Sequence, residues 1–170
     1  YTTLFRSYNC NLAKTEHAAY LLVVNRGAVA GVNYGHSVYE YKNGTWSILL
    51  NNYVEPNATQ TGIVGLDIEA EENGTLYILT SDDAVTSGVY NLRLKKYDPV
   101  TKQWSTVGGN PLPLDFKTST STSVAISIAP DGTPFVAYRD EQDQDYPKVI
   151  YLDNETKQWS DPHKLADIAS

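Results

Sequence analysis

The sequence lacks methionine, contains a single cysteine and has no long hydrophobic run. There are 0 Met among its 170 residues. Because an open reading frame begins with Met, we expect the chain to be a processed product or a fragment. With one cysteine, Cys10, no internal disulfide can form, and we expect this side chain to be an ordinary buried thiol. No run of about 18 apolar residues is present, so we predict no membrane span.

Positive charge is also scarce. The chain has 13 Lys+Arg against 20 Asp+Glu, a formal net charge of -7. A nucleic-acid partner requires a basic face, so we do not expect one. Aromatic residues are plentiful by contrast, with 13 Tyr and 3 Trp, while only 19% of residues are charged. This balance favours a β-rich domain over a charged helical one.

The first seven residues match the translation of a common sequencing adapter. We expect residues 1–7 to be non-native and leave them out of the fold prediction. The natural N-terminal part would then be missing, and the sequence would carry no information about a signal peptide.

The remaining residues contain an internal repeat. Residues 73–78 resemble residues 131–136, and Thr-Lys-Gln-Trp-Ser occurs at both 101–105 and 156–160. Three tryptophans, Trp46, Trp104 and Trp159, are each followed by Ser and lie 58 and 55 residues apart. Independent loops would not produce this pattern. We expect these tryptophans to fill the space between neighbouring repeats.

Each repeat contains four short strand-like runs separated by Gly, Asn, Asp and Pro. Several runs alternate apolar and other residues, as in Val124, Ile126 and Ile128. A period of this length with four strands predicts an all-β fold, a β-propeller fragment of about three four-stranded antiparallel blades. The predicted blades are residues 8–50, 61–108 and 121–165, with strands a to d in each and strand d opening at the tryptophan.

The repeat also resembles known propeller sequences. The pattern from Tyr97 and Asp98 to Trp104 resembles the strand c–turn–strand d segment of kelch repeats. Residues 129–138 are similar to blades of secreted surface propellers. Residues 43–46 approach the Asp-box of sialidase-type propellers but lack its Ser and Asp. The resemblance implies a kelch-like propeller architecture and no catalytic residue.

Loop lengths predict which end of the blades binds a ligand. The a–b and c–d turns are short, whereas the b–c loops (26–36, 81–88 and 140–147) and the d–a connections (51–62 and 108–122) are long. Long loops at one end of a rigid scaffold commonly carry binding residues. The candidate ligand-binding residues are Asp82, Asp83, Asp140, Asp143, Asp145, Tyr138 and Tyr146. Tyr34 and Tyr53 could also stack on sugars, although tyrosines that merely fill strand ends are the alternative.

Metal and catalytic signals are weak. Ca²⁺ could bind the acidic loop around Asp143, but the spacing does not match an EF-hand, and a solvated acidic loop is the alternative. No other cofactor is expected. His17, His36 and His163 lack metal-ligand spacing.

Four Asn-x-Ser/Thr sequons favour a secreted or cell-surface glycoprotein. They are Asn43, Asn57, Asn73 and Asn154. Three of them lie in predicted short turns, which would leave the long-loop end free of glycan.

The predicted function is a ligand-binding module, for a glycan or a protein, in a secreted or cell-surface propeller. One alternative is a fragment of a propeller hydrolase or oxidase, sialidase-like or galactose-oxidase-like. Such an enzyme would carry acidic residues on its innermost strands, and Asp67 is the candidate. Another alternative is a structural spacer without a binding site. Three blades leave two exposed sheet flanks, so we also expect contact with remaining blades or self-association.

Overall fold

The computed structural model describes residues 7–29, 32–54, 63–83, 90–109, 112, 124–140, 143–144 and 146–164. Its elements are β-strands. The first four are β1 (Ser7–Lys14), β2 (Ala19–Val29), β3 (Val32–Lys42) and β4 (Thr45–Tyr53), followed by β5 (Ile63–Ala70), β6 (Leu76–Asp83), β7 (Tyr90–Asp98) and β8 (Gln103–Thr106), and then by β9 (Val124–Ile128), β10 (Pro134–Asp140), β11 (Tyr146–Tyr151) and β12 (His163–Lys164).

The strands form three four-stranded sheets, each built from consecutive strands in order. We call β1–β4 the first sheet, β5–β8 the second and β9–β12 the third. All neighbouring strands pair antiparallel. The prediction of three four-stranded antiparallel sheets is confirmed.

Two elements differ from the prediction. The expected b–c loop at 26–36 is almost entirely strand, because β2 continues to Val29 and β3 begins at Val32. Backbone pairing continues there beyond the last alternating apolar residues, with Arg26 opposite Tyr34. In the third sheet, Trp159 makes only an isolated bridge to Leu152, and the fourth strand is the two-residue β12. Pro162 lies between them and has no N–H to continue the ladder.

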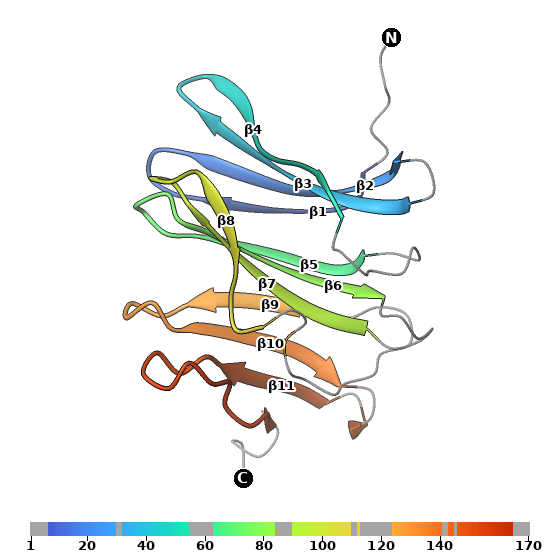
Figure 1. Ribbon diagram of the computed structural model, residues 1–170, viewed down its shortest axis with the longest axis vertical. Coiled ribbons are helices and arrows are strands. Elements are labelled where there is room, and N and C mark those ends of the chain that lie inside the picture. The colour runs from blue at the N-terminus through green and yellow to red at the C-terminus, as the bar shows by residue number, and fades with distance from the viewer. Residues whose placement is uncertain are drawn as a thin grey trace.

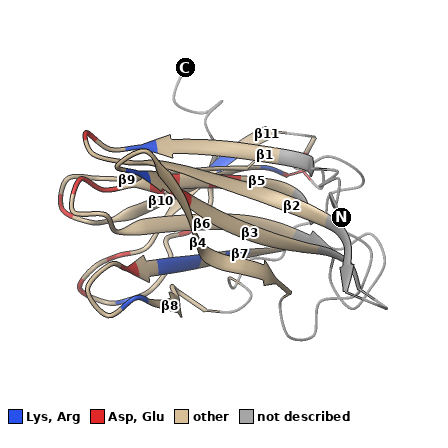
Figure 2. Ribbon diagram, turned by 90° about the horizontal axis from the view of Figure 1, so that it is seen from above, with Lys and Arg blue, Asp and Glu red and all other residues tan. Residues whose placement is uncertain are grey.

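Equivalent turns are closed by equivalent hydrogen bonds. Before β6, the Thr75 N–H donates to the Asn73 side chain at 2.8 Å. Before β10, the Thr133 N–H donates to Asp131 at 2.9 Å. Between β3 and β4, Asn43 and Gly44 have φ of 52° and 78°, as a two-residue hairpin requires. These turns lie at one end of the sheets, where Figure 2 shows many of the Asp and Glu residues. Acidic residues are therefore not confined to the long-loop end.

The three sheets stack face to face, with the first at one end of the stack and the third at the other (Figure 1). A core cluster that includes Leu22, Val38 and Ile78 joins the first and second sheets. Another, including Leu79 and Val136, joins the second and third. The sheets are therefore held together by apolar side chains of both facing surfaces, the arrangement expected of propeller blades.

Cys10 departs from the prediction of a buried thiol. Its side chain is exposed, because it lies on the face of the first sheet that points away from the second. Among the described residues, no helix is long and apolar enough to cross a bilayer.

Candidate functional site

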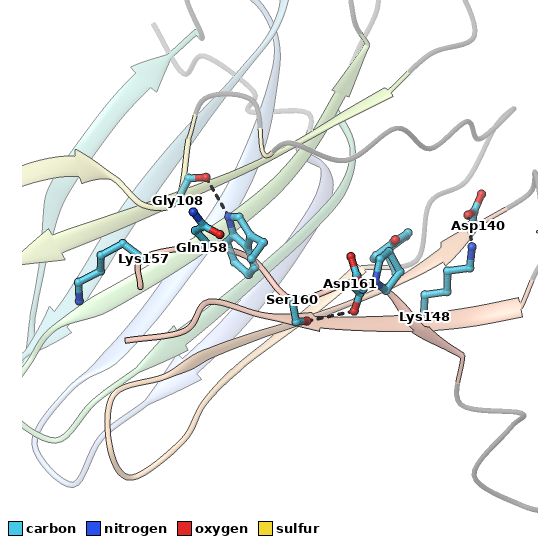
Figure 3. Close-up of a pocket in the computed structure, with 10 residues that line it drawn as sticks. Gly108, Asp140, Lys148, Lys157, Gln158, Ser160 and Asp161 are labelled. Carbon is cyan, nitrogen blue, oxygen red and sulfur yellow. Dashed lines mark hydrogen bonds and ion pairs between the residues drawn. The ribbon is translucent and has the colours of Figure 1, made fainter. Parts of the chain in front are cut away.

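A pocket of about 580 Å³ opens between the second and third sheets. Its size is within the range of small-molecule sites. Gly108, just after β8, contributes from the second sheet, and β10, β11 and the segment after the last c–d turn contribute from the third (Figure 3). The lining residues are Gly108, Tyr138, Asp140, Lys148, Lys157, Gln158, Trp159, Ser160, Asp161 and Pro162.

An ion-pair cluster forms the polar end of this pocket. The Lys148 ammonium lies 2.7 Å from Asp140 Oδ2 and 3.1 Å from Asp143 Oδ2. The hydrogen bond that the Lys148 ammonium donates to Asp140 raises the pKa of Lys148, with a further contribution from Asp143. Lys148 is therefore held charged, and its ammonium pairs with the buried carboxylate of Asp140.

Tyr138 lies beside this cluster. It is directly opposite Lys148 in the β10–β11 pairing. Burial raises the pKa of its phenol, which remains protonated near neutral pH.

Trp159 forms the aromatic end of the pocket. Its indole Nε1 donates a hydrogen bond of 2.8 Å to the carbonyl of Gly108, so that the side chain bridges the two sheets. Gly108 has a φ of 69°, and a Cβ there would collide with the indole ring. This glycine is therefore required both by its backbone conformation and by the close approach of Trp159. The Ser160 hydroxyl accepts from the Tyr151 N–H at 3.2 Å and fixes the chain beside the tryptophan.

The pocket thus combines aromatic surface with fixed charged donors and acceptors. Such a combination suits a polar ligand with an apolar face, because ring C–H groups can pack on the indole while hydroxyls meet the charged groups. The described residues contain no group of three His, Cys, Asp or Glu side chains placed to hold a metal ion. Asp140 and Asp143, two of the carboxylates considered for Ca²⁺, both contact Lys148 instead.

The structure brings together part of the predicted ligand-binding set. Tyr138 and Asp140 line the pocket, and Asp143 contacts its lysine. Tyr146, the first residue of β11, is exposed and not in the lining. Asp82 and Asp83 are the last residues of β6, not loop residues. Their side chains, and Asp145 as a whole, lie outside the described part.

Sequence reasoning missed Lys148 and gave Trp159 only a packing role. The available signal for Lys148 was its position at the start of the predicted third strand, across the hairpin from Tyr138. Tyr53 lies elsewhere, between the first and second sheets, where the Lys95 ammonium sits 4.5 Å from its ring centre. The side chain of Tyr34 is outside the described residues.

Asp67, the candidate acid of the hydrolase alternative, has a structural role. Its Oδ1 accepts from the Asn11 side chain on β1, and its Oδ2 accepts from the Ile126 N–H on β9 at 2.8 Å. The carboxylate thus connects one strand of each sheet.

Comparison with solved structures identifies the fold that the three stacked sheets form. A fucose lectin from Kordia zhangzhouensis in complex with methyl-fucoside is 11% identical, with a TM-score of 0.52 over 89% of this chain and 96% of the lectin chain. A Penicillium chrysogenum α-L-arabinanase complexed with arabinobiose is 14% identical, with a TM-score of 0.61 over 94% of this chain and 49% of the enzyme chain. A Trypanosoma rangeli sialidase mutant is 12% identical, with a TM-score of 0.55 over 89% of this chain and 29% of that chain.

The chain has the β-propeller fold. Its three sheets are propeller blades, and β1, β5 and β9 are their neighbouring first strands. The propeller described here spans about half the length of the arabinanase. No protein-family model matches the sequence, and no curated protein matches it either. At these identities the similarity concerns the fold alone.

Proposed function

We propose that this propeller binds carbohydrate in the pocket between its second and third sheets. The observation that carries the proposal is the meeting of Trp159 and Tyr138 with the Asp140–Lys148 pair in one pocket of about 580 Å³. An aromatic ring beside fixed charged groups matches the alternating apolar and hydroxyl surfaces of a sugar ring. The propeller neighbours crystallised with methyl-fucoside and arabinobiose add support by fold analogy only.

A binding titration tests this proposal. Methyl-fucoside and arabinobiose are the first probes, followed by a glycan array, with affinity measured by calorimetry. Gln158→Ala removes one polar group from the pocket rim. We expect the Kd of a bound glycan to rise about five- to tenfold, the loss expected for one hydrogen bond.

The repeat supplies a matched control. Gln103 occupies the same place in the other Thr-Lys-Gln-Trp-Ser segment, at 101–105, but lies outside the pocket. Gln103→Ala should therefore leave the Kd unchanged. Equal effects of the two variants, or no saturable binding to any glycan on the array, would refute the proposed site.

The proposed context is a secreted or cell-surface, kelch-like glycoprotein. Asn43, Asn73 and Asn154 are exposed and lie in the short turns, at the opposite end from the b–c connections. Glycans there would leave the Asp140 end of the pocket open. Mass spectrometry of native material that found glycan only at Asn57 would contradict this arrangement.

The hydrolase alternative has one observation in its favour. Glu69 and Asp67 alternate along β5 and so share a face, and burial, together with the charge of Asp67, raises the pKa of Glu69. A carboxyl group with a raised pKa can act as a general acid. Hydrolysis of chromogenic arabinosides, fucosides or sialosides that disappears in Glu69→Gln would support this alternative. Binding without turnover would support the lectin-like function.

A further inference from the structure

The three repeat tryptophans occupy equivalent places but have different surroundings. Trp104 Nε1 donates to the Leu49 carbonyl of the first sheet at 3.1 Å, and Trp159 Nε1 donates to the Gly108 carbonyl beside the second sheet at 2.8 Å. Trp104 and Trp159 therefore each donate a hydrogen bond to the sheet that precedes their own. Trp46, in the first sheet, has the same geometry relative to its neighbouring tyrosine. The ring centres of Tyr41 and Trp46 are 5.1 Å apart, as are those of Tyr97 and Trp104. Yet Trp46 is 52% exposed.

Trp46 belongs to a larger apolar face. The strand pairing places Leu12, Leu21, Tyr39 and Ile48 in one row across the first sheet. Leu12 is 65% exposed, whereas Ile68, in the same position of the second sheet, is 3% exposed because the first sheet covers it. Cys10 lies two residues before Leu12 on the same face and is exposed as well. We call this surface the front face of the first sheet.

The opposite end of the stack also presents apolar side chains. Phe135 is 38% exposed on the outer side of the third sheet, with its ring 5.6 Å from that of Tyr151. Ala137 and Val149 form the next pair on the same side. In the second sheet, the matching positions Tyr77 and Leu79 pack against the third sheet. We call this surface the back face of the third sheet.

We propose that the front face of the first sheet packs against the back face of the third sheet of a second copy of this chain, so that two copies close a ring of six blades. The two faces are those that meet at each junction within the chain, so the contact repeats a geometry already present twice. Head-to-tail contacts of this kind generate a closed ring when the rotation between copies allows it. Six blades lie within the range of about 4–8 found in propellers.

The comparisons agree with this number of copies. The chain spans 49% of the arabinanase chain, so two copies would match its length. The chain also covers 96% of the Kordia lectin chain, a separate polypeptide of similar size. In the ring, Trp46 Nε1 donates to a carbonyl of the other copy. Because Trp104 and Trp159 bond to carbonyls three and four residues after the preceding tryptophan, that carbonyl belongs to Pro162 or His163 of the partner subunit. The inference is independent of the proposed carbohydrate pocket, which lies within one copy.

The oligomeric state of the full 170-residue chain tests the proposal. Light scattering after size-exclusion chromatography should give twice the chain mass of 18.8 kDa. Leu12→Asp on the front face and Phe135→Asp on the back face should each give monomers, with circular dichroism and carbohydrate binding unchanged. Val100→Asp is the matched control, because Val100 is an exposed apolar residue of a c–d turn outside both faces. It should remain dimeric.

Mixing distinguishes the proposed contact from other assemblies. Each of the two monomeric variants keeps one intact face, so an equimolar mixture should form a dimer with a single junction. A dimer that persists in Phe135→Asp indicates a front-to-front contact and would overturn the proposal. A monomeric wild-type chain would also overturn it and would point to blades of a longer polypeptide. An open polymer would overturn the closed ring.

The single cysteine provides an independent readout. Cys10 lies on the front face, so its reaction with a thiol reagent should slow by at least tenfold as the concentration of wild-type chain rises. It should stay fast in Leu12→Asp. Equal rates at all concentrations in both proteins would contradict burial of this face.

Discussion

The indole N–H of Trp104 and that of Trp159 each join two sheets through a single hydrogen bond. Both donate to a carbonyl of the preceding sheet, whereas Trp46 has no preceding sheet in the described chain. A tryptophan suits this role because it fills the wide gap between twisted sheets and carries a donor at its edge.

Replacing Trp104 by Phe should therefore lower the free energy of unfolding by about 1 kcal/mol for the lost hydrogen bond, and by somewhat more for the lost area. Trp46→Phe should change it by less than about 0.5 kcal/mol, as surface substitutions do. Both are measured by urea unfolding in the Leu12→Asp background, where the front face is uncovered. Equal losses in the two variants would contradict the assigned role.

His36 should make folding sensitive to acid. The ring is buried, both nitrogens lack a hydrogen-bond partner among the described residues, and burial with the nearby Lys95 charge lowers its pKa to about 3. Between pH 6.5 and 3 the unfolded chain binds a proton that the folded chain does not. Stability is therefore complete above pH 6.5 and declines below it, by at most about 1.4 kcal/mol per pH unit.

Substitution of His36 by Met, which has a similar volume, should remove this pH dependence. The variant should be at least as stable as the wild type at pH 8, because two unpaired polar atoms are lost. It should be clearly more stable at pH 4.5. The melting temperatures of the wild type and of His36→Met are compared between pH 8 and pH 4.5. If both fall by the same amount over this range, His36 does not titrate in it.

The a–b turns depend on a glycine in the left-handed region. Gly132 has a φ of 83°, and a Cβ there would meet no other atom within 4 Å. Gly132→Ala should therefore destabilise the chain only through backbone strain, by about 1 kcal/mol. The c–d turns offer the opposite experiment, because Lys102 is a non-glycine residue with a φ of 57°. Lys102→Gly should be neutral or stabilising in the same unfolding assay, and a destabilisation like that of Gly132→Ala would refute the strain argument.

The strands could be predicted because their signals are local. Alternation in residues 124–128 and the turn chemistry at Asn73 and Asp131 correctly predicted strands and hairpins. The extension of β2 and β3 was missed because the apolar alternation ends before it, whereas backbone pairing carries β3 through Gly35, opposite Asn25, and places Arg26 opposite Tyr34.

The site could be predicted only in part, because it is built from segments that meet through stacking. Tyr138 and Asp140 stood out as residues next to a long acidic loop. Lys148 did not, because its place opposite Tyr138 depends on a register set across that loop. The closeness of Gly108 to Trp159 depends on how the second and third sheets pack, which no single repeat encodes.

At the scale of the whole molecule, Asp67 connects all three sheets. It accepts from Asn11 in the first and from the Ile126 N–H in the third, while lying on β5 of the second. Asp67→Asn replaces one of the two carboxylate oxygens by an NH₂ group, which faces one of these donors and cannot accept its hydrogen bond. Hydrogen bonds to a charged group contribute about 1.5–3 kcal/mol each, and we expect a loss of about 2 kcal/mol.

Hydrogen exchange would locate this loss. The Ile126 amide should exchange faster in Asp67→Asn, because its acceptor on the neighbouring sheet is weakened, whereas amides within the β6–β7 ladder should keep their protection. Glu69→Gln, two residues along the same face of β5, is the control and should leave Ile126 protected. If both variants exchange alike at Ile126, the sheets are held together by their apolar cores alone. If only Asp67→Asn responds, a carboxylate on an innermost strand couples the blades and makes them unfold as one unit.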